Sequence, residues 1–267
     1  MKNQLTILQN FIITNEDVLN HLKSDMGLKA TSSVLGECEW IVNYKTKLYL
    51  DDIKTLYGKY LNNYTLYNNL EDENFTWATS TLALLKEVKT PYVFYLTEDR
   101  MFHKTTREEF TAVMDEVVKN NVGFVQIGKL HKYSLSKYPA RVQNYNQHNH
   151  HPWGPIPPYM DNDKHIYTFL AKHSPIGVLS IDAIFRKDVF EKSVERVIHT
   201  WNKAEENKAQ ILEYGKYRTN QGREWNWLVE GMPEMLCAIP KKEIVVSDDD
   251  PGYSKFIKNQ WWENKNG

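Results

Sequence analysis

The chain has 267 residues, of which 41% are hydrophobic and 25% are charged, and its net charge is −1. This balance predicts a globular protein with one large α/β domain or two small ones. The sequence has no block of Lys and Arg and no apolar run of roughly 18 residues, which argues against a duplex nucleic-acid partner and against a transmembrane segment.

Strands and helices alternate in the first half of the chain. Apolar runs of strand length occur at residues 5–14, 39–44, 63–68, 92–97 and 122–127. Helical spacing of apolar residues predicts helices at 15–26, at 51–60, from 76 to 88 and after Thr105. Strands that alternate with helices favour parallel pairing with right-handed crossovers.

Local signals describe two of these helices further. Gly27 follows the first helix and is predicted to end it. Thr105 and Glu108 have the spacing of a capping box at the start of the last one. The buried face of that helix is predicted at the i, i+3, i+4 and i+7 positions, which are Phe110, Val113, Met114 and Val117.

The alternation fails after Gly128. Residues 131–164 are rich in Tyr, Asn, His and Pro, and they predict a long loop of the kind that is usually functional or disordered. Further strands are predicted at 166–171, 176–181 and 244–246, and further helices at 187–213 and 223–232.

The most informative stretch is Thr90–Phe102, which reads TPYVFYLTEDRMF. The run 92–96 has no polar alternation, which predicts a strand buried on both faces. Glu98 and Asp99 follow it, at the carboxyl end of a strand, where open α/β sheets bind ligands. Two adjacent acids in a dry neighbourhood need a cation or strong donors to stay ionised. A divalent metal that carries substrate phosphates is therefore predicted, with solvated acids at a strand end as the alternative.

Three blocks of sequence resemble nucleotide-sugar glycosyltransferases of the GT-A fold, family 2-like. They read KEVKTPYVFYLTEDRMF, SPIGVLSIDAIFRKDVFEK and QGREWNWLVEGM, and with the first strand they span about residues 5–232. The resemblance implies an α/β fold with a GT-A-like (Rossmann-like), mostly parallel central sheet flanked by helices. It also implies a single domain at 1–267, with a nucleotide-binding half at 1–128, an acceptor half at 129–247 and a C-terminal tail at 248–267.

The same resemblance implies a metal-dependent, inverting transfer of a sugar from a nucleotide-diphosphate donor to a glycan or other hydroxyl acceptor, with Mn²⁺ or Mg²⁺ as cofactor. The family's acid cluster often continues with another Asp, whereas here Thr97 and Arg100 bracket the pair. Asp99 is therefore assigned to the metal, and Glu98 to a ribose hydroxyl or to the water shell of the metal. Arg100 either covers a phosphate or neutralises the acids, which would make the metal dispensable.

The nucleotide is predicted to lie over the ends of the first two strands. The candidate donor-binding residues that follow these strands are Thr14, Glu16, Asn43, Tyr44 and Lys45. Trp77, on a later helix, either flanks this place or packs in the core. The acid that the family usually carries after the second strand is missing, which leaves the nucleobase of the donor open.

Transfer to a hydroxyl requires a general base. The resemblance implies that Glu224 is this base, with Glu230 as the second candidate; a helix-start acid and a solvent-facing acid are the alternative interpretations. On the acceptor side, Trp153 is predicted as a stacking surface and His173 lies close in sequence. The nearby His148, His150 and His151 lack a Cys neighbour and helical ligand spacing, which disfavours a zinc site.

Two other functions remain open. A sugar-phosphate nucleotidyltransferase has a similarly wound sheet but should carry a Gly-rich phosphate loop after the first strand, and QNFIITNEDV has no glycine. A non-catalytic module that binds carbohydrate or protein would use the abundant aromatic residues.

Cysteine usage and the N-terminus bear on the compartment. Cys38 and Cys237 form no C-x-x-C motif, which predicts reduced structural thiols. The first residues lack a small-residue cleavage site. A cytoplasmic protein is therefore expected.

Overall fold

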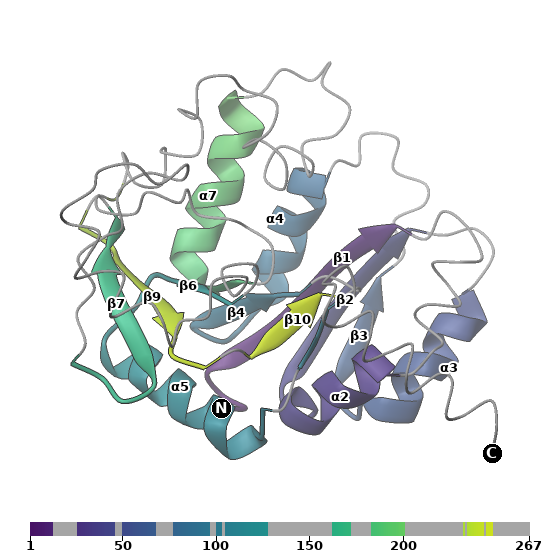
Figure 1. The fold of residues 1–267 in the computed structure, drawn as a ribbon. Coiled ribbons are helices and arrows are strands. Elements are labelled where there is room, and N and C mark those ends of the chain that lie inside the picture. Colours follow the sequence, from purple (N-terminus) through teal and green to yellow (C-terminus); the bar gives the residue numbers. More distant parts are fainter. Residues whose placement is uncertain are drawn as a thin grey trace.

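A computed structural model provides the fold. It describes residues 1–12, 26–45, 50–67, 77–96, 100–102, 105–127, 162–171, 183–200, 232, 234–242 and 244–247. Within this part of the chain, one large sheet has helices on both faces and a small two-stranded sheet beside it (Figure 1).

The large sheet contains eight of the described strands, in the order β3-β2-β1-β4-β8-β6-β9-β7. They are β1 (Leu5–Ile12), β2 (Glu39–Lys45), β3 (Tyr64–Tyr67), β4 (Tyr92–Tyr95), β6 (Phe124–Gln126), β7 (Ile166–Leu170), β8 (Ala183–Arg186) and β9 (Leu236–Pro240). β1 pairs in parallel with β2 and β4, whereas β8 runs antiparallel between β4 and β6. The predicted α/β class, with a mostly parallel central sheet flanked by helices, is confirmed.

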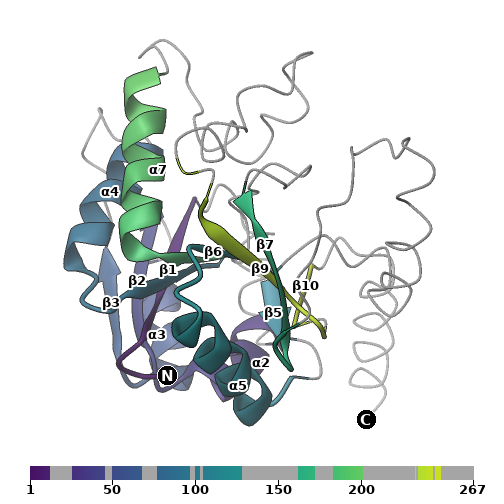
Figure 2. The ribbon, with the colours of Figure 1, turned by 90° about the vertical axis from the view of Figure 1, so that its left-hand side faces the viewer.

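The helices form two layers. Their bounds are α2 (Met26–Leu35), α3 (Leu50–Tyr60), α4 (Trp77–Glu87), α5 (Arg107–Lys119) and α7 (Lys187–Thr200). In Figures 1 and 2, α2, α3 and α5 lie on one face of the sheet, and α4 and α7 lie on the other. Side chains alternate along β1 accordingly: Ile7 packs in the cluster that contains Phe110 of α5, and Leu8 in the cluster that contains Leu85 of α4. Each face of the sheet therefore buries an apolar surface.

The small sheet consists of β5 (Arg100–Phe102) and β10 (Val245–Ser247), which pair antiparallel. Phe102 is buried, and its ring meets the rings of Phe94 and Phe110 edge-on, with centroids 6.1 and 5.2 Å apart. The small sheet is thus attached to the face of the large sheet that α2, α3 and α5 cover.

Most predicted elements within the described residues are confirmed, with ends that shift by a few residues. The strands predicted at 5–14, 39–44, 63–68, 92–97, 122–127, 166–171 and 244–246 correspond to β1, β2, β3, β4, β6, β7 and β10. The buried face predicted for α5 is also confirmed. The predictions for residues 15–25, 131–161, 176–181, 201–213 and 223–231 lie outside the described residues.

The predicted helix stop at Gly27 is wrong. Gly27 is the second residue of α2, a helix that the sequence did not predict. The buried side of α2 includes Thr31 beside Val34 and Leu35, so its apolar pattern is short and interrupted. Packing against the sheet outweighs the cost of a glycine in a helix, which is about 1 kcal/mol relative to alanine.

The capping box of α5 lies one residue later than predicted. Thr106 is the N-cap: its hydroxyl accepts a bond from the Glu109 amide at 3.2 Å, and the Glu109 carboxylate accepts one from the Thr106 amide at 2.9 Å. The segment TTREE contains two boxes with the same spacing, so local sequence alone does not choose between Thr105 and Thr106.

Strands β8 and β9 were not predicted either. Ala183–Arg186 forms β8 and Leu236–Pro240 forms β9 inside the same sheet. Both strands are short and are buried by neighbours distant in the sequence, so neither shows a local alternation.

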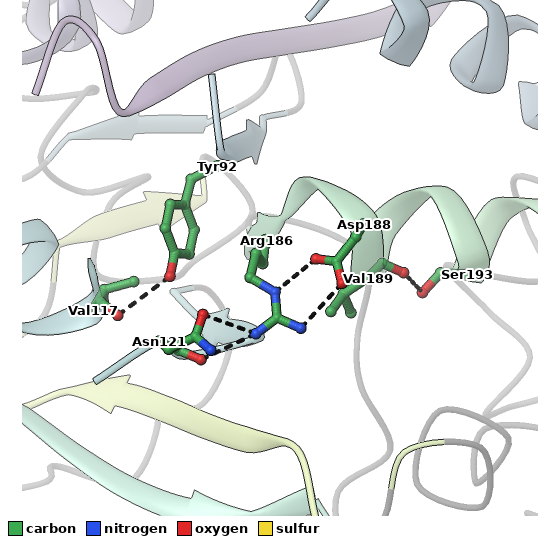
Figure 3. A network of polar contacts seen from close by, with 7 residues as sticks. All are labelled: Tyr92, Val117, Asn121, Arg186, Asp188, Val189 and Ser193. Atoms are coloured by element: carbon green, nitrogen blue, oxygen red, sulfur yellow. Dashed lines mark hydrogen bonds and ion pairs between the residues drawn. The ribbon is translucent and has the colours of Figure 1, made fainter. Parts of the chain in front are cut away.

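An ion-pair network joins β8 to α7 and to the end of α5 (Figure 3). Arg186 donates from Nε and Nη2 to the two carboxylate oxygens of Asp188, at 2.6 and 3.1 Å. Its Nη1 donates to the Asn121 side chain at 2.9 Å, and Asn121 has a left-handed backbone with a φ of 51°. In the pairing of β8 with β4, Arg186 lies opposite Tyr92, the first residue of β4. This network therefore lies at the amino end of β4.

Replacing Asp188 with Asn is expected to lower the free energy of unfolding by about 0.5–1 kcal/mol at pH 7. The hydrogen bonds from Arg186 hold the pKa of Asp188 below its ordinary value. A lowered carboxyl pKa stabilises the fold above the unfolded value of about 4, and this stabilisation is lost as the pH falls through the folded value. Urea unfolding at several pH values should therefore show the wild type and Asp188→Asn converging below about pH 4; a gap that stays constant would contradict the ion pair.

Candidate functional site

The carboxyl ends of β1, β2 and β4 share one edge of the sheet. Leu8 of β1 is level with Ile41 of β2 and with Tyr95, the last residue of β4. Past this level, β1 and β2 continue as a pair to Ile12 and Lys45. The edge is therefore stepped: β4 ends at the level of Leu8, on the low side of the step, whereas β1 and β2 continue to Ile12 and Lys45 on the raised side.

The predicted residues Asn43, Tyr44 and Lys45 are the last three residues of β2 and lie on this raised part of the edge. Asn43 is 1% exposed, and its Nδ2 donates to Ser80 Oγ of α4 at 3.0 Å. This bond holds the first turns of α4 against the end of β2. Trp77 is the first residue of α4, three residues before Ser80 in the sequence.

Gln9 is a polar residue of this edge that the sequence did not single out. It is 4% exposed, and its Oε1 accepts a hydrogen bond of 2.6 Å from the hydroxyl of Tyr57 in α3. Gln9 therefore ties β1 to α3, as Asn43 ties β2 to α4 on the opposite face. A Gln in the apolar run LTILQNFI was the available signal, because a buried polar side chain requires a partner.

The remaining predicted site residues lie outside the described part of the chain or are described only in their backbone. Arg100 begins β5, so its backbone lies in the small sheet. The other predicted residues, all outside the described residues, are Thr14, Glu16, Glu98, Asp99, Trp153, His173, Glu224 and Glu230. Their roles stay predictions. The described residues contain no group of three His, Cys, Asp or Glu side chains placed to hold a metal.

Both cysteines are free, as the lack of a C-x-x-C motif predicted, and both are buried. Burial raises the pKa of Cys38 to about 11 and that of Cys237 to about 12. The thiolate is the nucleophilic form of cysteine. Both side chains are therefore neutral thiols near pH 7, unsuited to nucleophilic catalysis.

Asn43→Ala is expected to lower the free energy of unfolding by about 1–3 kcal/mol, because the change removes a buried hydrogen bond to Ser80. Ser80→Ala is the matched control, since it breaks the same bond and leaves Asn43 in place. Titration of both variants with a nucleoside diphosphate separates two roles. Equal affinity losses assign the effect to the position of α4, whereas a larger loss in Asn43→Ala assigns the amide to the nucleotide.

No protein-family model and no curated protein matches this chain. Solved structures do. Residues 1–349 of Staphylococcus aureus TarS are 10% identical over 91% of this chain and 60% of that chain, with a TM-score of 0.49. Mouse xyloside xylosyltransferase 1 is 9% identical over 87% of this chain and 83% of that chain, with a TM-score of 0.38.

A third similar structure is 4-diphosphocytidyl-2C-methyl-D-erythritol synthase from Anaerococcus prevotii, 15% identical over 82% of this chain and 87% of that chain, with a TM-score of 0.41. TarS and a xylosyltransferase are thus among the structures that this chain resembles. This chain spans 60% of the TarS fragment. Likeness at these identities and TM-scores says nothing of substrate or mechanism.

None of the described helices is both long enough and apolar enough to cross a bilayer.

Proposed function

We propose that this protein is a glycosyltransferase that moves a sugar from a nucleoside-diphosphate donor to a hydroxyl acceptor. The observation that carries the proposal is the shared edge of three parallel neighbours, β1, β2 and β4. Ligands of open α/β sheets bind beyond such an edge. Tyr44 and Lys45, at the stepped end of β2, are proposed for the nucleotide beside the buried Asn43, and the acid pair follows β4 in the sequence.

A divalent cation, Mn²⁺ or Mg²⁺, is proposed at the acid pair, with Asp99 as its ligand. Asp99 directly precedes β5, and Asp248 directly follows β10. Because the two strands are antiparallel and Arg100 is the register partner of Ser247, the start of β5 lies beside the end of β10. Two acidic segments therefore join the small sheet at one end, and carboxylate oxygens are ligands that suit these cations. When bound, the cation would supply positive charge to the diphosphate.

The chemistry of the proposed transfer needs a base and a leaving group. Glu224 takes the proton of the acceptor hydroxyl, whose oxygen forms a bond to the anomeric carbon while the bond to the diphosphate oxygen breaks. The nucleoside diphosphate leaves with the electron pair of that bond. Attack in line with the departing group inverts the anomeric centre, and this stereochemistry is proposed on the resemblance of the sequence blocks.

A nucleotidyltransferase is the second candidate, because its sheet is similarly wound. Its chemistry uses a Gly-rich loop whose amides hold phosphates. The residues after β1 read ITNEDV, with no glycine, which favours the glycosyltransferase.

Thermal-shift titration with UDP, GDP, dTDP and CMP, each with Mn²⁺ and with chelator, tests the proposed function. Stabilisation by ligand binding grows with concentration above the dissociation constant. We expect one of the three nucleoside diphosphates, rather than CMP, to stabilise the protein and Mn²⁺ to strengthen the effect. If none of the four stabilises it, the non-catalytic binding module is the better interpretation.

A further inference from the structure

β5 contacts both α2 and β10. Among the described strands, β5 pairs only with β10, and the pairing covers three residues on each side. Phe102 anchors the far end of β5 in the core, whereas Arg100, at the other end, is the register partner of Ser247. The placement of Arg100, which directly follows Asp99 in the sequence, therefore depends in part on where β10 lies.

Two residues just before β10 hold it to the body of the protein. Ile244 is 2% exposed and packs in the cluster that contains Phe94 and Phe110. Lys242 donates from Nζ to Glu109 Oε1 at 2.6 Å. The capping box described above orients Glu109, because the second carboxylate oxygen accepts the Thr106 amide.

These contacts close a ring. The chain runs from β5 through residues 103–106 into α5, the first turn of α5 carries Glu109, Glu109 pairs with Lys242, and β10 then returns to β5. A ring of this kind restrains the backbone of β5 from both sides. Removing the ion pair between Lys242 and Glu109 opens this ring. The lost contact is exposed, so the change leaves the core packing in place.

We propose that β10 is a positioning strand for the donor site and that Lys242 is the positioning residue that holds it, through Glu109. This inference rests on the proposed function, because the acid pair that directly precedes β5 in the sequence is the proposed metal and donor site. Lys242 acts through Glu109 and the backbone and does not touch the substrate.

Lys241 offers a matched control at the adjacent position. Its Nζ donates to the Asp163 carbonyl and lies 4.7 Å from the centre of the Tyr167 ring. Lys241 therefore holds the edge formed by β7 and β9, away from the small sheet. Changing either lysine to Gln or to Glu alters the net charge of the protein equally.

Hydrogen exchange of the peptides that contain residues 100–102 and 245–247 measures the opening of the small sheet. An exposed ion pair changes an opening equilibrium by at most about fivefold. We expect exchange to rise about twofold to fivefold in Lys242→Gln, and further in Lys242→Glu, where two carboxylates repel. Both peptides should exchange at the wild-type rate in Lys241→Gln and Lys241→Glu.

Titration with UDP, GDP and dTDP in the presence of Mn²⁺ provides the functional arm of the test. The dissociation constant of the nucleotide should rise in Lys242→Gln and rise further in Lys242→Glu. The melting temperatures of both variants should stay close to that of the wild type. Unchanged exchange in Lys242→Glu, or an equal rise in Lys241→Glu, overturns the positioning role. If Lys242→Glu opens the small sheet and nucleotide affinity stays constant, β10 does not position the donor site. A wild-type protein that binds none of the nucleotides overturns the proposed function, while the exchange result still decides whether Lys242 holds β10.

Discussion

Glu224→Gln is expected to lower the turnover number by about 10²–10⁴-fold while donor affinity stays near the wild-type value. Gln preserves the shape of the side chain and most of its hydrogen bonding. It cannot accept the proton of the acceptor hydroxyl at neutral pH, so only the transfer step loses its base. Initial-rate kinetics with saturating donor, together with nucleotide titration, separate these two quantities.

Glu230→Gln is the companion variant. The helix-start interpretation of Glu224 predicts a stability loss of about 0.3–1 kcal/mol and nearly unchanged turnover. If Glu224→Gln behaves in that way and Glu230→Gln is inactive, the base is Glu230. Normal turnover in both variants would show that the base lies elsewhere and that the block QGREWNW was a misleading match.

Asp99→Asn is expected to abolish the activity that Mn²⁺ or Mg²⁺ stimulates, with little change in melting temperature. The substitution keeps the volume of the side chain but removes the charge that offsets a divalent cation. The proposed position of Asp99 depends on two described neighbours. Leu96, just past β4, donates its amide to the Leu8 carbonyl at 3.1 Å, and Arg100 begins β5.

Asp115→Asn is the control for this variant, because Asp115 is an exposed acid on α5 and the change in charge is the same. Activity should be measured with added Mn²⁺ and with chelator for the wild type and both variants. Full activity of Asp99→Asn in the presence of chelator would exclude the metal role. Wild-type activity that is insensitive to chelator would instead indicate that Arg100 neutralises the acid pair.

The elements that the sequence predicted best have strong local patterns. The run Tyr92–Leu96 is buried throughout, as its lack of polar alternation indicated. The face of α5 formed by Phe110, Val113, Met114 and Val117 is buried as its spacing predicted. In both cases the burial of each residue follows from the pattern of apolar residues close to it in the sequence, so this pattern is enough to predict it.

The elements that the sequence missed are held by distant partners. α2 contains Gly27 and an interrupted apolar face, and packing against the sheet keeps it helical. β8 and β9 are short, and their pairing partners are separated from them by long stretches of sequence. For the candidate site, the sequence indicated Asn43 but missed its bond to Ser80 and the bond between Gln9 and Tyr57.

The sequence by itself determined the buried strands of the first half of the chain, the apolar face of α5 and the polar residues at the end of β2. Composition and periodicity are local properties, and these features depend on little else. The tertiary structure alone decided that β8 runs antiparallel between β4 and β6, that β5 pairs with β10 and that Thr106 caps α5. Each of these choices depends on contacts between residues far apart in the chain, as with Glu109 and Lys242, and no local pattern encodes them.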